Sequence, residues 1–367
     1  MASWPVVCAL LLLSLMVSAW LMPMGIGFGM RRASALKQMR TGSLILLGWV
    51  GMGLFSSLLV LTVARELVLL AAMALNGMEV MAIAVEPLRR WSALVVSLLG
   101  GGATLWGFVN ARRTASVVTV DVPVADLPAA LHGFRIAQIS DIHVGPTIRH
   151  EYVRSIVNAV NQLDADMVAI TGDLVDGSVR ELASHVAPLA DLRSRHGTYF
   201  VTGNHEYYSG AHAWISELQR LGVHVLLNRH VVLRHGDEQD GNEALAVVAG
   251  VTDYNAGHFD PAHRSDPHLA IAGAPSDAGV RLLLAHQPRS AMAAAEAGFD
   301  LQLSGHTHGG QFLPWNFLVP LQQPFVAGLD RLQGLWVYTS RGTGYWGPPK
   351  RFGAPSEITL LRLLRKK

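Results

Sequence analysis

The sequence has a single cysteine and few charged residues, and both shortages narrow the class of protein. Cys8 is the only cysteine among 367 residues, so no disulfide can form within the chain. Charged residues make up 15% of the sequence and hydrophobic residues 50%, whereas a typical soluble protein has about 25% charged residues. The composition therefore excludes a disulfide-stapled or disordered protein, and it predicts that part of the chain lies in lipid.

Histidine is absent from the first 131 residues. All 16 histidines fall between His132 and His308. Residues 1–113 carry a net charge of +6, and the remainder carries −4. A mildly acidic second part lacks the basic face of a general nucleic-acid binder, so no nucleic-acid partner is expected. We expect two parts in different solvents, with the titratable chemistry in the aqueous second part.

Long uncharged runs in the first part predict membrane-spanning helices. An α-helix needs about 20 apolar residues to cross the hydrocarbon core of a bilayer. Four stretches approach or exceed this length: 4–30, 41–64, 67–85 and 91–111. We therefore expect an all-α transmembrane region of four helices in a multi-pass protein of the cell membrane. The third stretch contains Asn76 and Glu79, and the carboxylate must either lean towards the headgroups or mark a polar site.

The basic residues between these stretches predict an orientation. No Lys or Arg precedes the first stretch, so a cleaved secretory signal is the less favoured alternative. Six basic residues lie in the first and third links, and three lie on the opposite side: Arg65, Arg112 and Arg113. The positive-inside rule then predicts that the second part lies on the exoplasmic face, periplasmic or extracellular.

The second part alternates between strand and helix patterns. Residues 114–131 are expected to form a linker or a strand before a domain at 132–367. Apolar runs there predict strands at 134–140, 167–171, 198–202, 244–250, 281–286 and 301–304, with helical spacing between some of them, as at 151–163. This alternation predicts an α/β domain whose strands are buried on both faces. The last two strands, at 335–340 and 357–364, lack a long helix between them, so part of the sheet should be mixed or antiparallel.

Polar motifs follow five of these strands. In open α/β sheets the carboxyl ends of strands form the edge that binds ligands. Seven metal-binding side chains would meet there: Asp141, His143, Asp173, Asn204, His286, His306 and His308. Imidazole, carboxylate and amide groups without thiolate suit manganese, iron or zinc.

Seven donors exceed the needs of one tetrahedral ion, but two divalent ions sharing a bridging carboxylate would use all of them. Such a pair activates water and stabilises both the attacking and the leaving oxygen at phosphorus. Each motif alone is more often a turn. Five of them in order, each ending a strand, favour the metal centre.

The ordered motifs ISDIH, GDLVD, GNHE, LLLAH and SGHTHGG resemble the calcineurin-like metallophosphoesterase superfamily. The segments LSGHTHGGQ, TSRGTGYWGPP and APSEITLLRL are most similar to its branch of membrane-associated or secreted bacterial phosphoesterases, known as YkuE and YaeI. The resemblance covers residue 134 to the end. It implies a four-layer α/β/β/α sandwich. A four-helix leader departs from the short signal or single anchor of other branch members.

The resemblance also implies a role for each motif residue. Asp141, His143 and His308 would bind one divalent ion, with Asp173 bridging to the second. The second ion would be bound by Asn204, His286 and His306. The resemblance further implies that His205 protonates the leaving-group oxygen. Asp176 would then hold the imidazole of His205 and favour its charged form.

These residues predict a membrane-anchored, binuclear phosphoesterase that cleaves phosphodiester or pyrophosphate bonds by attack of a metal-bridging hydroxide. The branch suggests a lipid-linked substrate of the UDP-diacylglucosamine type. A broad-specificity phosphomonoesterase and a non-catalytic receptor or transport subunit are the alternatives, and the presence of both His205 and Asp176 favours turnover.

Two groups of nearby residues have open interpretations. Arg341 is either a phosphate contact or a surface charge. Five aromatic residues either line an apolar groove for a lipid or pack beneath a long loop: Trp315, Phe317, Trp336, Tyr345 and Trp346.

Overall fold

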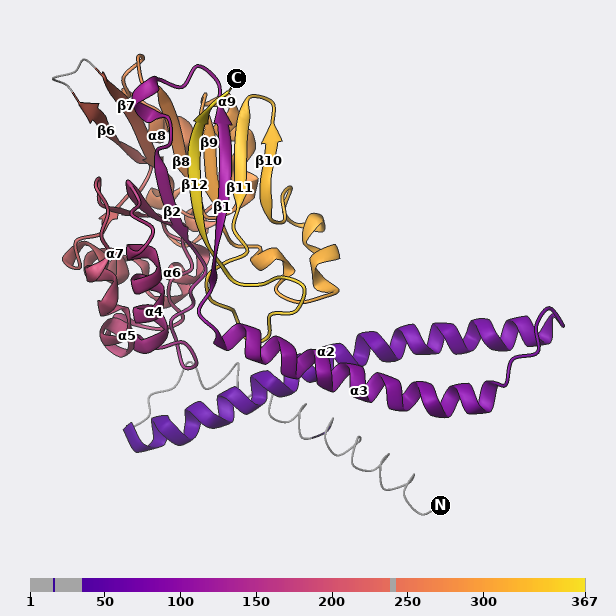
Figure 1. Ribbon diagram of the computed structural model, residues 1–367. Helices are drawn as coiled ribbons and strands as arrows, with labels where there is room; N and C mark the ends of the chain where they lie inside the picture. Colours follow the sequence, from indigo (N-terminus) through magenta and orange to yellow (C-terminus); the bar gives the residue numbers. More distant parts are fainter. Residues whose placement is uncertain (1–15, 17–34, 238–241, 367) are drawn as a thin grey trace. The chain divides into compact units, whose positions relative to one another are not determined.

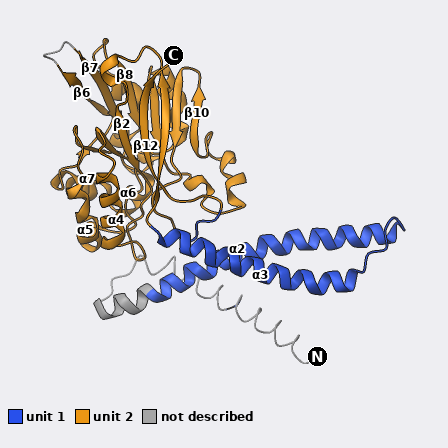
Figure 2. Cartoon of the chain, in the orientation of Figure 1, with its two compact units in different colours: residues 1–113, 347–352 blue, residues 114–346, 353–367 orange. Residues whose placement is uncertain are grey.

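The chain divides into two compact units (Figure 2). The computed structural model describes residue 16 and residues 35–237 and 242–366. The helical unit contains the described part of residues 1–113 together with 347–352, and the α/β unit contains 114–346 and the described residues from 353 onwards. The apolar stretch expected at 4–30 lies outside the described residues apart from Met16.

Two long helices, α2 (Ala35–Gly77) and α3 (Val85–Arg112), pack against each other in the helical unit (Figure 1). By length and composition alone, Ser43–Gly77 and Val85–Arg112 could each cross a membrane. Small residues let the helices approach closely. A Cβ atom added at Gly100 of α3 would lie 2.6 Å from the side chain of Leu58 in α2.

The structure has one continuous helix where the sequence predicted two, at 41–64 and 67–85. No glycine or proline separates these stretches. Within the helix, Arg65 donates from Nε to Ser92 Oγ at 2.9 Å and from Nη2 to Arg89 O at 2.9 Å. The turn comes later, at residues 78–84, where the Asn76 side chain exchanges two hydrogen bonds with the backbone of Ile83. The prediction of two separate helices here was wrong because a charged pair was interpreted as a break.

This correction also removes the basis for the predicted orientation. Arg65 lies inside α2, and Lys37, Arg40 and Arg112 lie towards the ends of α2 and α3 that are remote from the turn at 78–84. The six-to-three charge count assumed separate helices on either side of Arg65, so one helix at 35–77 leaves the predicted orientation without support.

The α/β unit is built on two six-stranded mixed sheets (Figure 1). The first sheet has the order β1 (Ser116–Val124), β12 (Glu357–Arg365), β2 (Arg135–Ile139), β3 (Met167–Ile170), β4 (Thr198–Phe200), β5 (His224–Val225). The second has the order β10 (Gly328–Leu332), β11 (Leu335–Thr339), β9 (Leu301–Ser304), β8 (Val280–Leu284), β7 (Asn242–Gly250), β6 (Arg229–Asp237). β12 runs antiparallel to β2, and β10 to β11, which confirms the predicted mixed pairing.

Alternating side chains of these strands form two cores. Leu282 and Leu284 of β8 point into a core shared with Ile136 and Leu361 of the first sheet. Leu283, between them, points to the opposite face, where it packs with residues of α9. Such strands are buried on both faces, as the continuous apolar runs predicted.

Helices flank the two sheets (Figure 1). Beside the first sheet lie α4 (His150–Asn161), α5 (Val179–Val186), α6 (Asn204–Ser209) and α7 (Ala211–Arg220). Helices α8 (Pro267–Ile271) and α9 (Ala291–Glu296) contribute to the outer core of the second sheet. Short 3-10 helices occur at η2 (Ala129–Leu131), η3 (Ala187–Asp191), η4 (Ala256–His258), η5 (Pro261–His263), η6 (Pro288–Ser290), η7 (His308–Gly310), η8 (Trp315–Phe317) and η9 (Val319–Leu321).

Residues 114–131 form a strand rather than a free linker. β1 pairs in parallel with β12 along its whole length, from Ser116 opposite Glu357 to Val124 opposite Arg365. Leu131, which follows in η2, is fully buried in the core between the sheets. The segment that joins the two units therefore begins the first sheet directly.

Residues 347–352 interrupt the sequence of the α/β unit and pack with the helices. Lys350 Nζ donates to Gly53 O at 3.0 Å and also hydrogen-bonds the Ser57 hydroxyl. The backbone N–H of Arg351 donates to Gly107 O at 2.9 Å. A Cβ atom at Gly107 would lie 2.6 Å from the Lys350 side chain, so glycine permits this approach.

Candidate metal centre

Five strand ends converge on one site, as the sequence predicted. Asp141 and His143 follow β2, and Asp173 follows β3. Asn204 follows β4 at the start of α6, and His286 follows β8. His306 and His308 follow β9. Both sheets therefore contribute donors to the same place.

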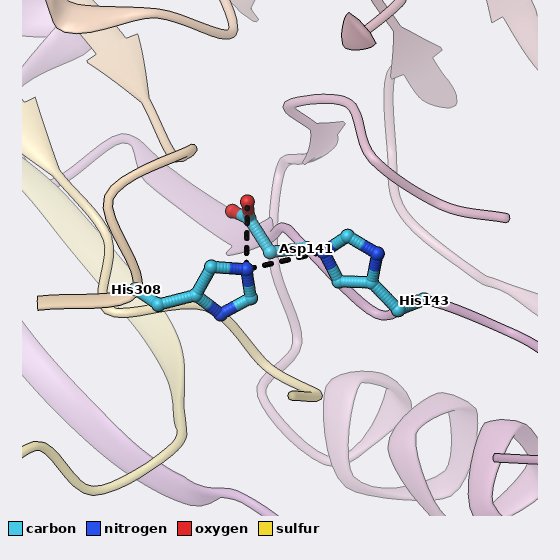
Figure 3. A group of neighbouring side chains, drawn as sticks. All are labelled: Asp141, His143 and His308. Carbon is cyan, nitrogen blue, oxygen red and sulfur yellow. Dashed lines mark hydrogen bonds and ion pairs between the residues drawn. The ribbon is translucent and has the colours of Figure 1, made fainter. Parts of the chain in front are cut away.

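The first donor group consists of Asp141, His143 and His308, whose side chains point toward one another (Figure 3). The Nε2 atoms of the two histidines lie 3.1 Å apart, and His308 Nε2 lies 3.6 Å from Asp141 Oδ1. Ligands bound to one metal ion at about 2.0 to 2.2 Å stand roughly 3 to 3.5 Å from each other. The observed separations fit a shared divalent ion.

The second donor group consists of Asp173, His286 and His306. His286 Nε2 lies 3.1 Å from Asp173 Oδ2 and 3.2 Å from His306 Nδ1. The same carboxylate oxygen lies 4.0 Å from His143 Nε2 in the first group. Asp173 thus stands between the two groups, as a bridging ligand would.

Asn204 carries the seventh predicted donor. Its Oδ1 is buried and accepts no hydrogen bond from any described residue. An unsatisfied buried amide oxygen is costly unless something binds it. A divalent ion would satisfy this oxygen, so the residues present fit a metal centre.

The pKa values of the two acidic residues proposed as ligands depend on their neighbours. Burial alone would raise the pKa of Asp173, but His286 and His205 together hold the pKa of this carboxyl well below its usual range. Burial raises the pKa of Asp141, and the Asp173 charge adds to this effect. A bound cation would favour the ionised form of both groups.

The backbone at the site is held in an unusual conformation. Five of the predicted ligands have left-handed φ angles between 48° and 70°: Asp141, His143, Asp173, His306 and His308. Non-glycine residues rarely adopt this conformation, and such strain concentrates at functional sites. The surrounding strands hold the ligand loops in place despite this cost.

Glycine allows these loops to approach each other. A Cβ atom at Gly305 would lie 2.0 Å from Ser140 Oγ and 2.2 Å from Asp141 Oδ2. At Gly203 it would lie 2.2 Å from Asp173 Oδ1. No side chain fits at either position without moving a ligand.

Glu206 supports the centre in a way that sequence reasoning missed. Its buried carboxylate accepts hydrogen bonds from the backbone N–H groups of Asp173 at 3.0 Å, Leu174 at 2.8 Å and Gly203 at 2.6 Å. Burial and the Asp173 charge raise the pKa of Glu206 to about 8, although the N–H donors favour the ionised form. The residue ties two ligand loops together, and its only sequence signal is the last letter of GNHE.

Asp176 holds two histidines at once. Its Oδ1 lies 2.6 Å from His205 Nδ1 and 3.0 Å from His143 Nδ1. Burial lowers the pKa of His205, but Asp173 and Asp176 together raise it to about 9. His205 lies next to the centre, with its Nε2 3.9 Å from Asp173 Oδ2. The contact between Asp176 and His143 was not predicted, because the two residues lie 33 positions apart in sequence.

Arg341 and the five aromatic residues whose interpretation the sequence left open differ in their surroundings. Arg341 pairs through Nη1 with buried Glu357 at 2.8 Å, so it is not an isolated surface charge. Trp336 donates to Pro123 O at 2.8 Å, and Tyr345 is 2% exposed, so both pack inside the fold. The other three aromatic side chains are largely exposed: Trp315, Phe317 and Trp346.

A further group of donors lies between α7 and the η5 region. His212 and Asp260 pair at 3.1 Å and stand near His263. The His212 side chain is 74% exposed.

Comparison with known proteins places the chain in a family. Residues 134–310 match the family model for the calcineurin-like phosphoesterases. The chain is 30% identical over 234 residues to an uncharacterised metallophosphoesterase of Aquifex aeolicus, covering 63% of this chain and 85% of that protein. The chain therefore belongs to the calcineurin-like metallophosphoesterase family.

Two further relatives define its branch. It is 28% identical over 275 residues to the uncharacterised metallophosphoesterase YkuE of Bacillus subtilis, covering 72% of this chain and 90% of YkuE, which confirms the resemblance to that protein. It is 40% identical over 260 residues to a Danio rerio "Transmembrane protein with metallophosphoesterase domain". That match covers 70% of this chain but only 59% of the fish protein's length.

Proposed function

We propose that this protein is a membrane-anchored phosphoesterase that cleaves phosphodiester or pyrophosphate bonds with two divalent ions. Asp141, His143 and His308 would hold one ion and share Asp173 with the other. The second ion would be held by Asn204, His286 and His306. Manganese, iron and zinc all suit these donors. The position of Asp173 between two donor groups carries this proposal.

When bound, the two ions supply a water nucleophile of lowered pKa and positive charge at the phosphoryl oxygens. The protein then has to supply a proton for the leaving alkoxide. His205 is the proposed donor, because Asp176 holds its Nδ1 and supports the charged imidazolium. The Nε2 atom of His205 lies on the ligand side, 3.9 Å from Asp173.

We propose that α2 and α3 anchor residues 1–113 in the membrane, while 132–367 carries the catalysis. Two basic residues, Arg89 and Arg90, lie in α3 towards the turn. Six lie before or near the start of α2 or at the end of α3: Arg31, Arg32, Lys37, Arg40, Arg112 and Arg113. The positive-inside rule then places the α/β unit on the cytoplasmic face, in place of the exoplasmic face expected from four helices.

A reporter fused to the carboxyl terminus tests this placement. Fluorescence from a cytoplasm-only reporter supports the cytoplasmic face. Activity from an export-dependent phosphatase reporter would restore the exoplasmic face and overturn the revised charge count.

For the substrate we propose a lipid-linked phosphodiester or pyrophosphate, with UDP-diacylglucosamine as a representative. Two observations support this choice: the similarity to the YkuE branch and the presence of two helices of membrane-spanning length. An anchor of this kind concentrates the site at the surface where such a substrate resides.

Turnover of model esters tests the proposal on the full chain purified in detergent. We expect manganese-dependent hydrolysis of bis(p-nitrophenyl) phosphate that is lost with a chelator and in His286→Ala. The matched variant His268→Ala, which removes an exposed histidine from α8, should retain it. Faster hydrolysis of p-nitrophenyl phosphate would indicate a phosphomonoesterase instead. A folded, metal-loaded protein without any turnover would indicate a binding subunit.

A further inference from the structure

A long uncharged segment follows the last predicted metal ligand. No Asp, Glu, Lys, Arg or His occurs at residues 309–329, between His308 and Asp330. Prolines at 314, 320 and 324 exclude a membrane-spanning helix. The structure instead has two short 3-10 helices there, η8 and η9. The segment carries no charge, but it does not have the form of a membrane anchor.

The apolar side chains of this segment point outward. We call residues 313–321 the apolar loop. Leu321 is 81% exposed, Phe317 is 72% exposed and Leu318 is 50% exposed. Leu313 and Trp315 of the same loop are 40% and 38% exposed. Single exposed apolar residues are common, but five large ones within nine positions mark an interaction surface.

The apolar loop is fixed to the metal-binding motif. A Cβ atom at Gly310 would lie 2.3 Å from Asn316 Cα, so the loop backbone rests directly on the end of the SGHTHGG motif. Thr307, between the two histidine ligands, donates from Oγ1 to Val326 O at 2.6 Å. The backbone of the apolar loop therefore rests on the backbone that carries His306 and His308, and this contact fixes the direction of the loop's side chains.

The residues just before the apolar loop contact the chain on either side of residues 347–352. The Gln311 side chain accepts from Trp346 N at 2.9 Å and donates to Trp346 O at 2.8 Å. Phe312 forms a β-bridge with Gly353, and a Cβ atom at 353 would lie 2.6 Å from the Leu313 side chain. Residues 347–352, between these two contacts, belong to the helical unit.

Within the helical unit, this connecting segment binds near the end of a proposed membrane helix. Arg351 hydrogen-bonds Gly107 O, and Asn110 Nδ2 donates to Arg351 O at 3.3 Å. α3 ends at Arg112, so these contacts lie within about two turns of its end. Trp346 and Gly353, which contact Gln311 and Phe312 just before the apolar loop, are therefore joined to each other by a short segment that packs with α2 and α3.

We propose that the apolar loop inserts its side chains into the interfacial layer of the same bilayer that holds α2 and α3. Tryptophan, phenylalanine and leucine suit this layer, and the loop has no charge to desolvate there. The metal centre then opens next to the lipid surface, and phosphate esters reach it from the headgroup layer. This inference rests on the membrane anchoring proposed above.

A depth-sensitive probe tests the insertion in the full chain. Cys8 is the only cysteine, so Cys8→Ser provides a background for single labels. Phe317→Cys and Leu321→Cys would carry an environment-sensitive nitrobenzoxadiazole probe in phosphatidylcholine vesicles. Leu269→Cys on α8, which is 57% exposed, is the matched control outside the loop.

We expect blue-shifted emission from the probes at 317 and 321, with strong quenching by doxyl-labelled lipid and none at 269. If the protein floats with the vesicles but the three probes show equal emission and quenching, the loop does not insert, and the anchoring still stands. If the protein does not float with the vesicles, both the anchoring and the insertion are overturned. Hydrolysis of bis(p-nitrophenyl) phosphate by the same samples reports on the catalytic proposal separately.

Discussion

Replacement of Asp176 by asparagine should expose the proton-donor step. The carboxylate holds His205 Nδ1 at 2.6 Å and His143 Nδ1 at 3.0 Å, so Asp176→Asn weakens two charge-assisted hydrogen bonds. Each such bond contributes about 1.5 to 3 kcal/mol. General acid catalysis contributes roughly 10²- to 10⁴-fold to a rate. We therefore expect kcat to fall about 100-fold for a substrate whose leaving group needs the proton.

The leaving group provides the discriminating assay. Phenol is a much weaker acid than p-nitrophenol, so its departure depends more on a donated proton. Asp176→Asn should therefore reduce kcat far more for the bis-phenyl than for the bis(p-nitrophenyl) phosphodiester, both assayed with saturating manganese. Saturation matters because Asp176 also orients His143, and loss of such an outer contact weakens metal binding by about 10- to 100-fold.

Asp164→Asn is the matched control, because it makes the same chemical change at a side chain that is 89% exposed. Its kcat should match that of the wild type for both esters. An equal loss for the two leaving groups in Asp176→Asn would refute the donor role of the His205–Asp176 pair. The residue would then act only through the metal ligand His143.

Three further predictions concern packing and pH. Glu206→Gln should lower the unfolding free energy by about 2 kcal/mol, because both carboxyl oxygens accept from backbone N–H groups and the amide replaces one of them by an NH2 donor; an unchanged melting temperature would contradict this. Gly305→Ala should abolish metal binding in a calorimetric titration, whereas Gly334→Ala, with open space at its Cβ position, should not. Burial lowers the pKa of His196, so protonation favours the unfolded chain below about pH 6.5. His196→Gln should therefore flatten the loss of stability on acidification, and an unchanged slope would argue against this.

The convergence of the seven side chains could be predicted because metal chemistry restricts the residue types and strand ends restrict their places. Each of the seven side chains follows an apolar run that forms a strand. Other parts depend on contacts that no local pattern encodes. Glu206 acts through backbone groups of another loop, and Asp176 reaches His143 across 33 positions.

The prediction of the helical unit failed for a different reason. The charges of Arg65 and Glu66 suggested a link between two helices, but tertiary hydrogen bonds keep Arg65 inside one helix. Hydropathy measures only composition, so it could not detect the hydrogen bonds that hold Arg65 in the helix. Nor does it reveal that residues 347–352, remote in sequence, pack with α2 and α3.

Metal stoichiometry tests the central claim most directly. Elemental analysis of the purified full chain, after dialysis against manganese or zinc, should give two ions for each chain. Asp173→Asn should weaken the binding of both ions. Asp141→Asn should weaken the binding of one ion and leave that of the other unchanged. A single ion in the wild-type protein, or two tightly bound ions and full turnover in Asp173→Asn, would contradict a binuclear centre bridged by this carboxylate.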